Sequence, residues 1–124
     1  MNDRTILAVA GSSLALATLC GALGAHELKG ALTPLALGTF ETAVRYQFYH
    51  SLGLLAVGIV AGSHRAVWIV RSAWLLIAGI ALFSGSLYAL TFGAPHVFGV
   101  LTPLGGLALI VGWVTFALAV RSAD

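Results

Sequence analysis

Residues 40–54, FETAVRYQFYHSLGL, place a carboxylate, a guanidinium, an amide, two phenols and an imidazole in one short stretch. The chain as a whole is 60% hydrophobic and only 8% charged, so this concentration is unusual. Ionisable groups at membrane depth are costly, and they usually pair with one another or face a bundle interior or a hydrated cavity. We therefore predict a functional polar cluster that also includes one loop histidine and one later tyrosine. Its members are Glu41, Arg45, Tyr46, Gln47, His50, His26 and Tyr88.

Two kinds of role are open to this cluster. Glu41 and Arg45 have the i,i+4 spacing and the order that favour an ion pair within one helix, and Arg45 can also extend to the headgroups. His50 lies deeper, on the face of Tyr46, and needs a hydrogen-bond partner from Tyr46, from water, or from a serine or tyrosine within residues 84–88. Such contacts either hold helices together or line a hydrated pathway.

Patterns typical of catalysis or metal binding do not occur. His26, His50 and His96 could gather on one side of a membrane, but no HxxxH or paired Cys/His spacing accompanies them. The sequence has no GxSxG or Ser-x-x-Lys element, no phosphate loop and no dinucleotide fingerprint. A net charge of +2, carried by few residues, forms no patch for nucleic acid. We therefore predict no enzyme activity, no cofactor, no metal and no nucleic-acid partner.

Long apolar segments must position the cluster. The mean hydropathy is +1.02, and four windows approach the ~20 residues that cross a hydrocarbon core of ~30 Å. We predict an all-α polytopic membrane protein in which residues 1–124 form a single four-helix transmembrane domain. The helices are expected at 5–25, 34–62, 72–92 and 97–120. The first window can also be read as a cleaved signal peptide, but we expect it to be retained.

Basic residues predict the orientation. With four spans, the side of the termini holds Arg4, Arg65, Arg71 and Arg121. The opposite side holds Lys29 and Arg45. By the positive-inside rule both termini are cytoplasmic, in a bacterial inner membrane. The excess is small, so an inverted or dual topology is the alternative.

A short internal repeat predicts two related hairpins. GAHELKGALTPL at 24–35 and GAPHVFGVLTPL at 93–104 share Gly, Ala, Gly, Leu, Thr, Pro and Leu at matched positions. Each follows an odd-numbered helix, which implies a pseudo-twofold axis along the membrane normal, although the biased composition is a competing explanation. Thr33 and Thr102 are suited to cap helices whose first residues are Pro34 and Pro103.

Four segments carry a resemblance to a known family: GAHELKG, FETAVRYQFYHSLGLLAVG, LFSGSLYAL and TPLGGLALIVGW. Together they resemble the small bacterial inner-membrane family that includes YgdD and YwdK, a domain of unknown function. The most specific element is the FET-x-VRYQ-x-YH block, which begins at Phe40. The resemblance implies four membrane helices and supplies no activity, substrate or catalytic residue.

These observations predict a non-enzymatic membrane module that binds lipid or a partner protein, with a homo-oligomer as one form of partnership. The alternative is a small transporter or channel in which Glu41, Arg45 and His50 line a hydrated pathway. An enzyme acting on a lipid or quinone is a third and weaker reading. A continuous cavity between Tyr46, His50 and the third helix would favour transport, and dry packing there would favour the module.

Overall fold

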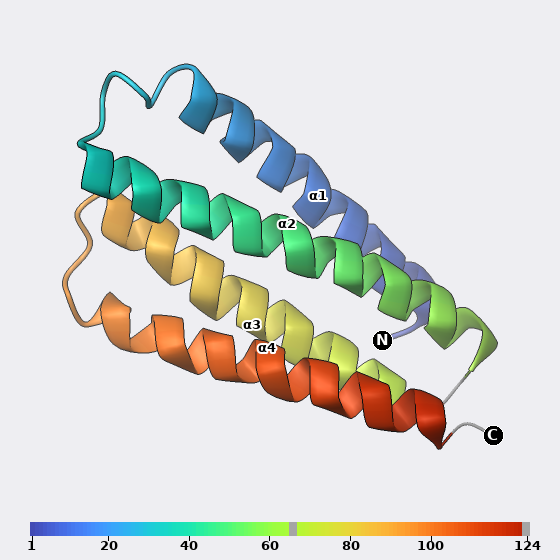
Figure 1. Cartoon of the computed structure of the whole chain (residues 1–124). Coiled ribbons are helices and arrows are strands. Elements are labelled where there is room, and N and C mark those ends of the chain that lie inside the picture. Colours follow the sequence, from blue (N-terminus) through green and yellow to red (C-terminus); the bar gives the residue numbers. More distant parts are fainter. Residues whose placement is uncertain (65–66, 123–124) are drawn as a thin grey trace.

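The computed structural model describes residues 1–64 and 67–122, and within these residues the chain forms helices and no strand (Figure 1). The helices are α1 (Asp3–Ala25), α2 (Pro34–Ser63), α3 (Val67–Thr91) and α4 (Phe98–Arg121). The predicted all-α class is therefore confirmed. The third helix begins at Val67 rather than at residue 72, because the apolar VWIV segment continues the helix toward its N-terminus. Arg65, one of the residues used for the orientation, lies outside the described residues.

Three of the described helices are long and apolar enough to cross a membrane by themselves: α1, α3 and α4. At most 28% of the most apolar window of each is buried inside the bundle, so most of their surface is suited to contact lipid. The 30-residue α2 does not meet that standard alone, because residues 41–50 make it too polar. It packs between α1 and α3, which buries Gln47 and Ser51, while Glu41 and Arg45 stay exposed.

The start of α2 follows the predicted cap. Thr33 has extended backbone angles, and its hydroxyl oxygen accepts a hydrogen bond from the backbone N–H of Ala36 at 3.2 Å. Pro34 occupies the first helical turn, where its missing N–H costs nothing. Thr33 and Pro34 therefore form the predicted N-terminal cap of α2.

The matching prediction for α4 is wrong. That helix begins at Phe98, and Pro103 lies inside it. Thr102 therefore lies within the helix and does not cap it, and its hydroxyl makes a 2.6 Å hydrogen bond with the hydroxyl of Ser86 in α3. The two TPL segments thus differ in local structure.

The chain forms two hairpins, α1–α2 and α3–α4, whose connections lie at the same end of the bundle (Figure 1). The free ends of α1 and α4 lie at the other end. This arrangement agrees with the predicted topology, while a rotational match between the two halves stays a prediction. Close helix contact is clearest between α3 and α4, where Gly105 lies directly against the backbone of Phe83.

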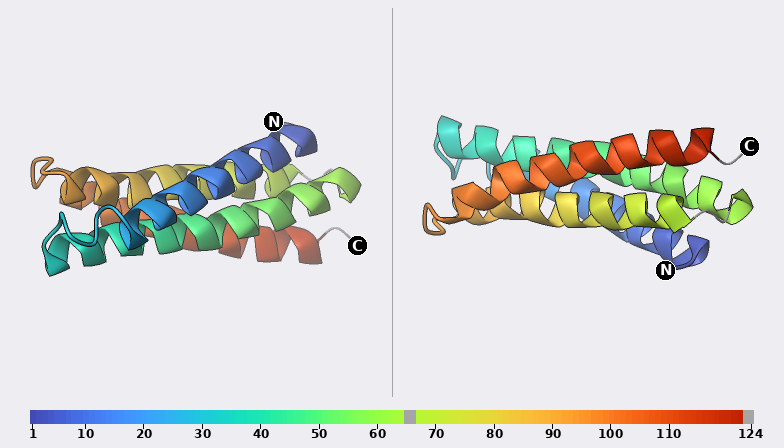
Figure 2. Two further views of the ribbon diagram at one scale, coloured as in Figure 1. Left: turned by 90° about the horizontal axis from the view of Figure 1, so that it is seen from above. Right: turned by 90° about the horizontal axis from the view of Figure 1, so that it is seen from below.

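The helix α1 runs obliquely to the other three (Figure 2). It packs along α2, and its N-terminal half contributes Ile6 and Ala10 to the main apolar core. The rest of that core comes from the facing sides of α2, α3 and α4, with Leu54, Val57, Ile69, Ala73, Leu76 and Leu109 among its members. Because α2 lies between them, α1 and α3 are separated along part of their length.

Candidate functional site

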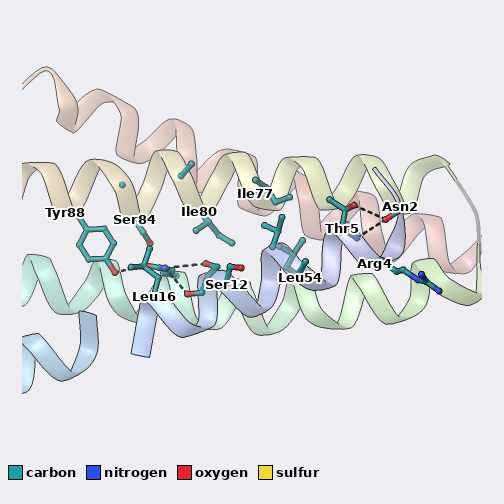
Figure 3. Close-up of a pocket in the computed structure, with 16 residues that line it drawn as sticks. Asn2, Arg4, Thr5, Ser12, Leu16, Leu54, Ile77, Ile80, Ser84 and Tyr88 are labelled. Atoms are coloured by element: carbon teal, nitrogen blue, oxygen red, sulfur yellow. Dashed lines mark hydrogen bonds between the residues drawn. The ribbon is translucent and has the colours of Figure 1, made fainter. Parts of the chain in front are cut away.

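A lateral groove with a volume of about 770 Å³ lies between α1 and α3 (Figure 3). We call it the α1–α3 groove. Its α1 wall consists of Asn2, Arg4, Thr5, Ala8, Val9, Ser12, Ser13 and Leu16. Its α3 wall consists of Ile77, Ile80, Ala81, Ser84, Gly85 and Tyr88, and α2 supplies Gln47 and Leu54 as the floor.

Small residues at helical spacing keep this groove open. On α1 the wall includes Ala8 and Ser12, and on α3 it includes Ala81 and Gly85, each pair spaced i,i+4. A Cβ atom added at Gly85 would meet no side chain or neighbouring backbone within 4 Å. The two walls therefore leave space between them where larger side chains would have closed the gap.

A buried amide closes the inner end of the groove. Gln47 is only 4% exposed, and its Oε1 accepts a 2.6 Å hydrogen bond from the hydroxyl of Tyr88 in α3. Its Nε2 donates to the backbone carbonyl of Ser13 in α1 at 3.0 Å and lies 3.4 Å from the Ser13 hydroxyl. A buried amide needs such partners, because leaving either of its atoms unsatisfied is expensive. Gln47 therefore ties together the three helices that surround the groove.

Two further serines complete this polar network. The hydroxyl of Ser51 donates to the hydroxyl of Ser13 at 2.6 Å, and the hydroxyl of Ser84 donates to the carbonyl of Ala43 at 2.7 Å. From the sequence alone, Ser84 is one of several possible partners for His50, and no role is predicted for Ser13 or Ser51. The i,i+4 spacing of Gln47 and Ser51 was the available signal, because it places both on one face of α2.

The other end of the groove is open and carries a positive charge. Arg4 is exposed there, beside Asn2, whose side-chain oxygen accepts bonds from the backbone N–H of Thr5 at 2.8 Å and from its hydroxyl at 2.9 Å. Figure 3 shows Arg4 and Tyr88 at opposite ends, with Leu54, Ile77 and Ile80 labelled between them. The groove is thus cationic at its mouth, apolar along its length and closed by a hydrogen-bonded network.

His50 and Tyr46 lie elsewhere, in an aromatic cluster on the side of α2 that approaches α4. Nδ1 of His50 lies 2.7 Å from the backbone carbonyl oxygen of Tyr46, and the two rings stack with centroids 5.8 Å apart. Tyr46 also contacts Phe83 at 4.5 Å between centroids, and His50 lies 6.3 Å from Trp113. Neither residue lines the groove.

Glu41 and Arg45 lie in a third region, apart from both the α1–α3 groove and the aromatic cluster. Both are exposed, and they border a smaller hollow of about 260 Å³ between α1 and α2. Within the described residues no ion pair joins them, so their predicted pairing along the helix is absent from this structure. His26 is exposed at the end of α1. Of the seven residues predicted to form one cluster, the structure brings only Gln47 and Tyr88 to the groove.

The polar lining of the groove consists of hydroxyls, amides and one guanidinium, and the described residues that line it include no carboxylate, imidazole or thiol. The described polar groups at its inner end already bond to one another. An apolar channel with a few polar groups at defined places is the usual form of a ligand site.

Comparison with known proteins identifies relatives of the whole chain. The sequence family described as "Protein of unknown function (DUF423)" matches residues 20–106. The chain is 40% identical over 119 residues to the UPF0382 membrane protein SERP0230 of Staphylococcus epidermidis, covering 96% of this chain and 95% of the relative. It is 43% identical over 105 residues to the UPF0382 membrane protein YwdK of Bacillus subtilis, covering 84% of this chain and 85% of the relative.

A third relative comes from another genus. A UPF0382 membrane protein of Haemophilus influenzae is 38% identical over 118 residues, which cover 94% of this chain and 93% of the relative. No solved structure matches the chain significantly. The relatives therefore support a membrane location, and the groove has to be interpreted from its own geometry.

Proposed function

The chain belongs to the DUF423 family and its relatives are membrane proteins, and from this premise we propose that it is a non-catalytic module that holds one anionic phospholipid in the α1–α3 groove. The observation that carries the proposal is the groove itself, which combines a cationic mouth with apolar walls and a closed inner end. In this proposal the headgroup lies beside Arg4 and an acyl chain lies along the walls.

The size of the groove suits a small ligand such as an acyl chain. Its volume of about 770 Å³ falls within the ~300–1,000 Å³ that is usual for small-ligand sites. A flexible apolar chain is an occupant of that size class.

The length of the groove matches one leaflet. From Arg4 to Leu16 along α1 the rise is ~18 Å at ~1.5 Å per residue, and half of a hydrocarbon core is ~15 Å. A lipid whose headgroup lies at the mouth would therefore have its chain end near Leu16 and Tyr88. The network around Gln47 provides a floor at that depth.

Charge at the mouth favours an anionic headgroup. The end of the bundle that contains the groove mouth carries Arg4, Arg71 and Arg121 with one carboxylate, Asp3. The opposite end carries Lys29 and Arg45 together with Glu27 and Glu41, so the described residues have a net positive charge only at the mouth end. By the positive-inside rule we propose that the mouth and both termini lie on the cytoplasmic side of a bacterial inner membrane. Basic residues near a membrane surface attract anionic lipids.

Transport is the weaker of the two functional readings. Among the described residues no single hollow contains Glu41, Arg45 and His50, which the transport hypothesis placed along one pathway. The α1–α3 groove opens sideways, and its inner end is closed by side chains that bond to one another. We therefore favour lipid binding.

The experiment is a thermal-unfolding titration of the delipidated protein in detergent. Phosphatidylglycerol should raise the unfolding midpoint more than phosphatidylcholine of the same chains, because a ligand that binds only the folded state stabilises it. Arg4→Gln should remove the difference between the two lipids. Arg121→Gln is the matched control, since Arg121 lies at the same end outside the groove.

Two results would count against the proposal. Equal stabilisation by both lipids in the wild type would exclude headgroup selection by Arg4. If neither lipid changed the midpoint, the groove would not be a phospholipid site.

A further inference from the structure

The exposed side of α2 carries opposite charges that pair with no other described residue. Glu41 and Arg45 are both exposed and lie one helical turn apart, and no ion pair joins them to each other or to another described residue. Exposed apolar side chains continue the same side of the helix at Phe48, Leu52 and Ile59, which are 38%, 45% and 63% exposed. We call these five residues the α2 stripe. It shares no residue with the α1–α3 groove.

We propose that the α2 stripe is the contact between two copies of this chain, in which Glu41 of each copy pairs with Arg45 of the partner subunit. This proposal is independent of lipid binding. Charged side chains on a membrane helix rarely face lipid and are usually paired. A second copy is the occupant that supplies the complementary charge at the same depth.

The geometry of a twofold contact fits this charge pattern. Two copies inserted in the same orientation are related by a twofold axis along the membrane normal, so both α2 helices run parallel and equivalent residues lie at equal depth. Glu41 of one helix and Arg45 of the partner subunit then differ by ~6 Å along the axis. Packed helices are ~8–10 Å apart, a gap that these two side chains can span. Because of the twofold axis, this ion pair forms twice in each dimer.

A hollow lies beside the charged residues of the α2 stripe. It has a volume of about 260 Å³, and Gly21, Gly24 and Ala25 of α1 border it. Gly24 is buried against Phe40 of the same chain, so α1 and α2 already approach each other closely at this point. In the proposed dimer Glu41 and Arg45 determine how the two subunits pair, and the hollow leaves room for side chains of the partner subunit.

Charge reversal tests the pairing directly. The full chain is reconstituted in vesicles of phosphatidylcholine, and self-association is measured by energy transfer between labelled copies. Wild-type protein should dimerise. Glu41→Arg and Arg45→Glu should each weaken self-association by about tenfold or more, because each creates two like-charge contacts across the interface.

Mixing the two variants distinguishes an ion pair between two subunits from an ion pair within one helix. A pair made of Glu41→Arg and Arg45→Glu has two attractive contacts, so the mixture should associate more strongly than either variant does alone. A pairing confined to one helix predicts no such recovery. Arg71→Glu, at the opposite end of the bundle, is the control and should dimerise as the wild type does.

Three outcomes would overturn the proposal: monomeric wild-type protein at every protein-to-lipid ratio, charge-reversed variants that dimerise normally alone, or a mixture that does not recover. If charge reversal prevents membrane insertion, Glu41→Gln and Arg45→Gln replace it. Each neutral variant should then weaken self-association several-fold, and unchanged association would equally overturn the pairing.

Discussion

The hydroxyl of Tyr88 in α3 donates a 2.6 Å hydrogen bond to Oε1 of Gln47 in α2, while Nε2 of Gln47 donates to the carbonyl of Ser13 in α1. One buried side chain thus connects three helices. In hydrocarbon no water can replace these bonds, so the position of the helices relative to one another depends on them. The same residues form the inner end of the α1–α3 groove.

We expect Tyr88→Phe to lower the stability of the solubilised protein by about 1 kcal/mol, because Oε1 of buried Gln47 loses its donor. The control is Tyr49→Phe. Tyr49 is 57% exposed, and no described residue bonds to its hydroxyl, so this variant should unfold as the wild type does. The measurement is the free energy of unfolding in mixed detergent and denaturant. Equal stability of the two variants would show that the Tyr88–Gln47 bond contributes nothing.

A second expectation concerns the contact between α3 and α4. A Cβ atom at Gly105 would collide with the backbone of Phe83, so Gly105→Ala must separate the helices. Overpacking of this kind costs about 1–3 kcal/mol. Gly106→Ala is the neighbouring control, because its Cβ would approach the Phe83 ring no closer than 3.7 Å, an ordinary contact. A loss of thermal stability in both variants, or in neither, would contradict this view of the interface.

The sequence predicted the elements well because hydropathy and caps act locally. At the start of α2 the Thr33 cap forms as predicted. The same dipeptide at Thr102 and Pro103 does not begin a helix, because α4 already starts at Phe98, and the Thr102 hydroxyl instead bonds to Ser86 on another helix. Contacts between helices are decided by packing, which a single sequence does not reveal.

The candidate site was only partly predictable for the same reason. The polar block on α2 was correctly recognised as unusual, but successive residues of a helix point in different directions. Gln47 consequently faces the groove, His50 faces the α4 side and Arg45 is exposed beside α1. The groove itself depends on the oblique path of α1 and on small residues such as Gly85. Neither feature can be recognised from the positions of polar residues in the sequence.

The most direct measurement of the central claim is the amount of phosphatidylglycerol that stays bound to the purified protein in native mass spectrometry. Gly85→Leu places a large side chain in the groove without a clash, and Gly11→Leu adds the same side chain to α1 outside the groove, where a Cβ also meets nothing within 4 Å. Both changes replace a helical glycine by a better helix former, so both variants should fold. We predict one bound lipid on the wild type and on Gly11→Leu, and at least a tenfold lower occupancy on Gly85→Leu. Equal occupancy in all three proteins would contradict the assignment of the α1–α3 groove as a lipid site.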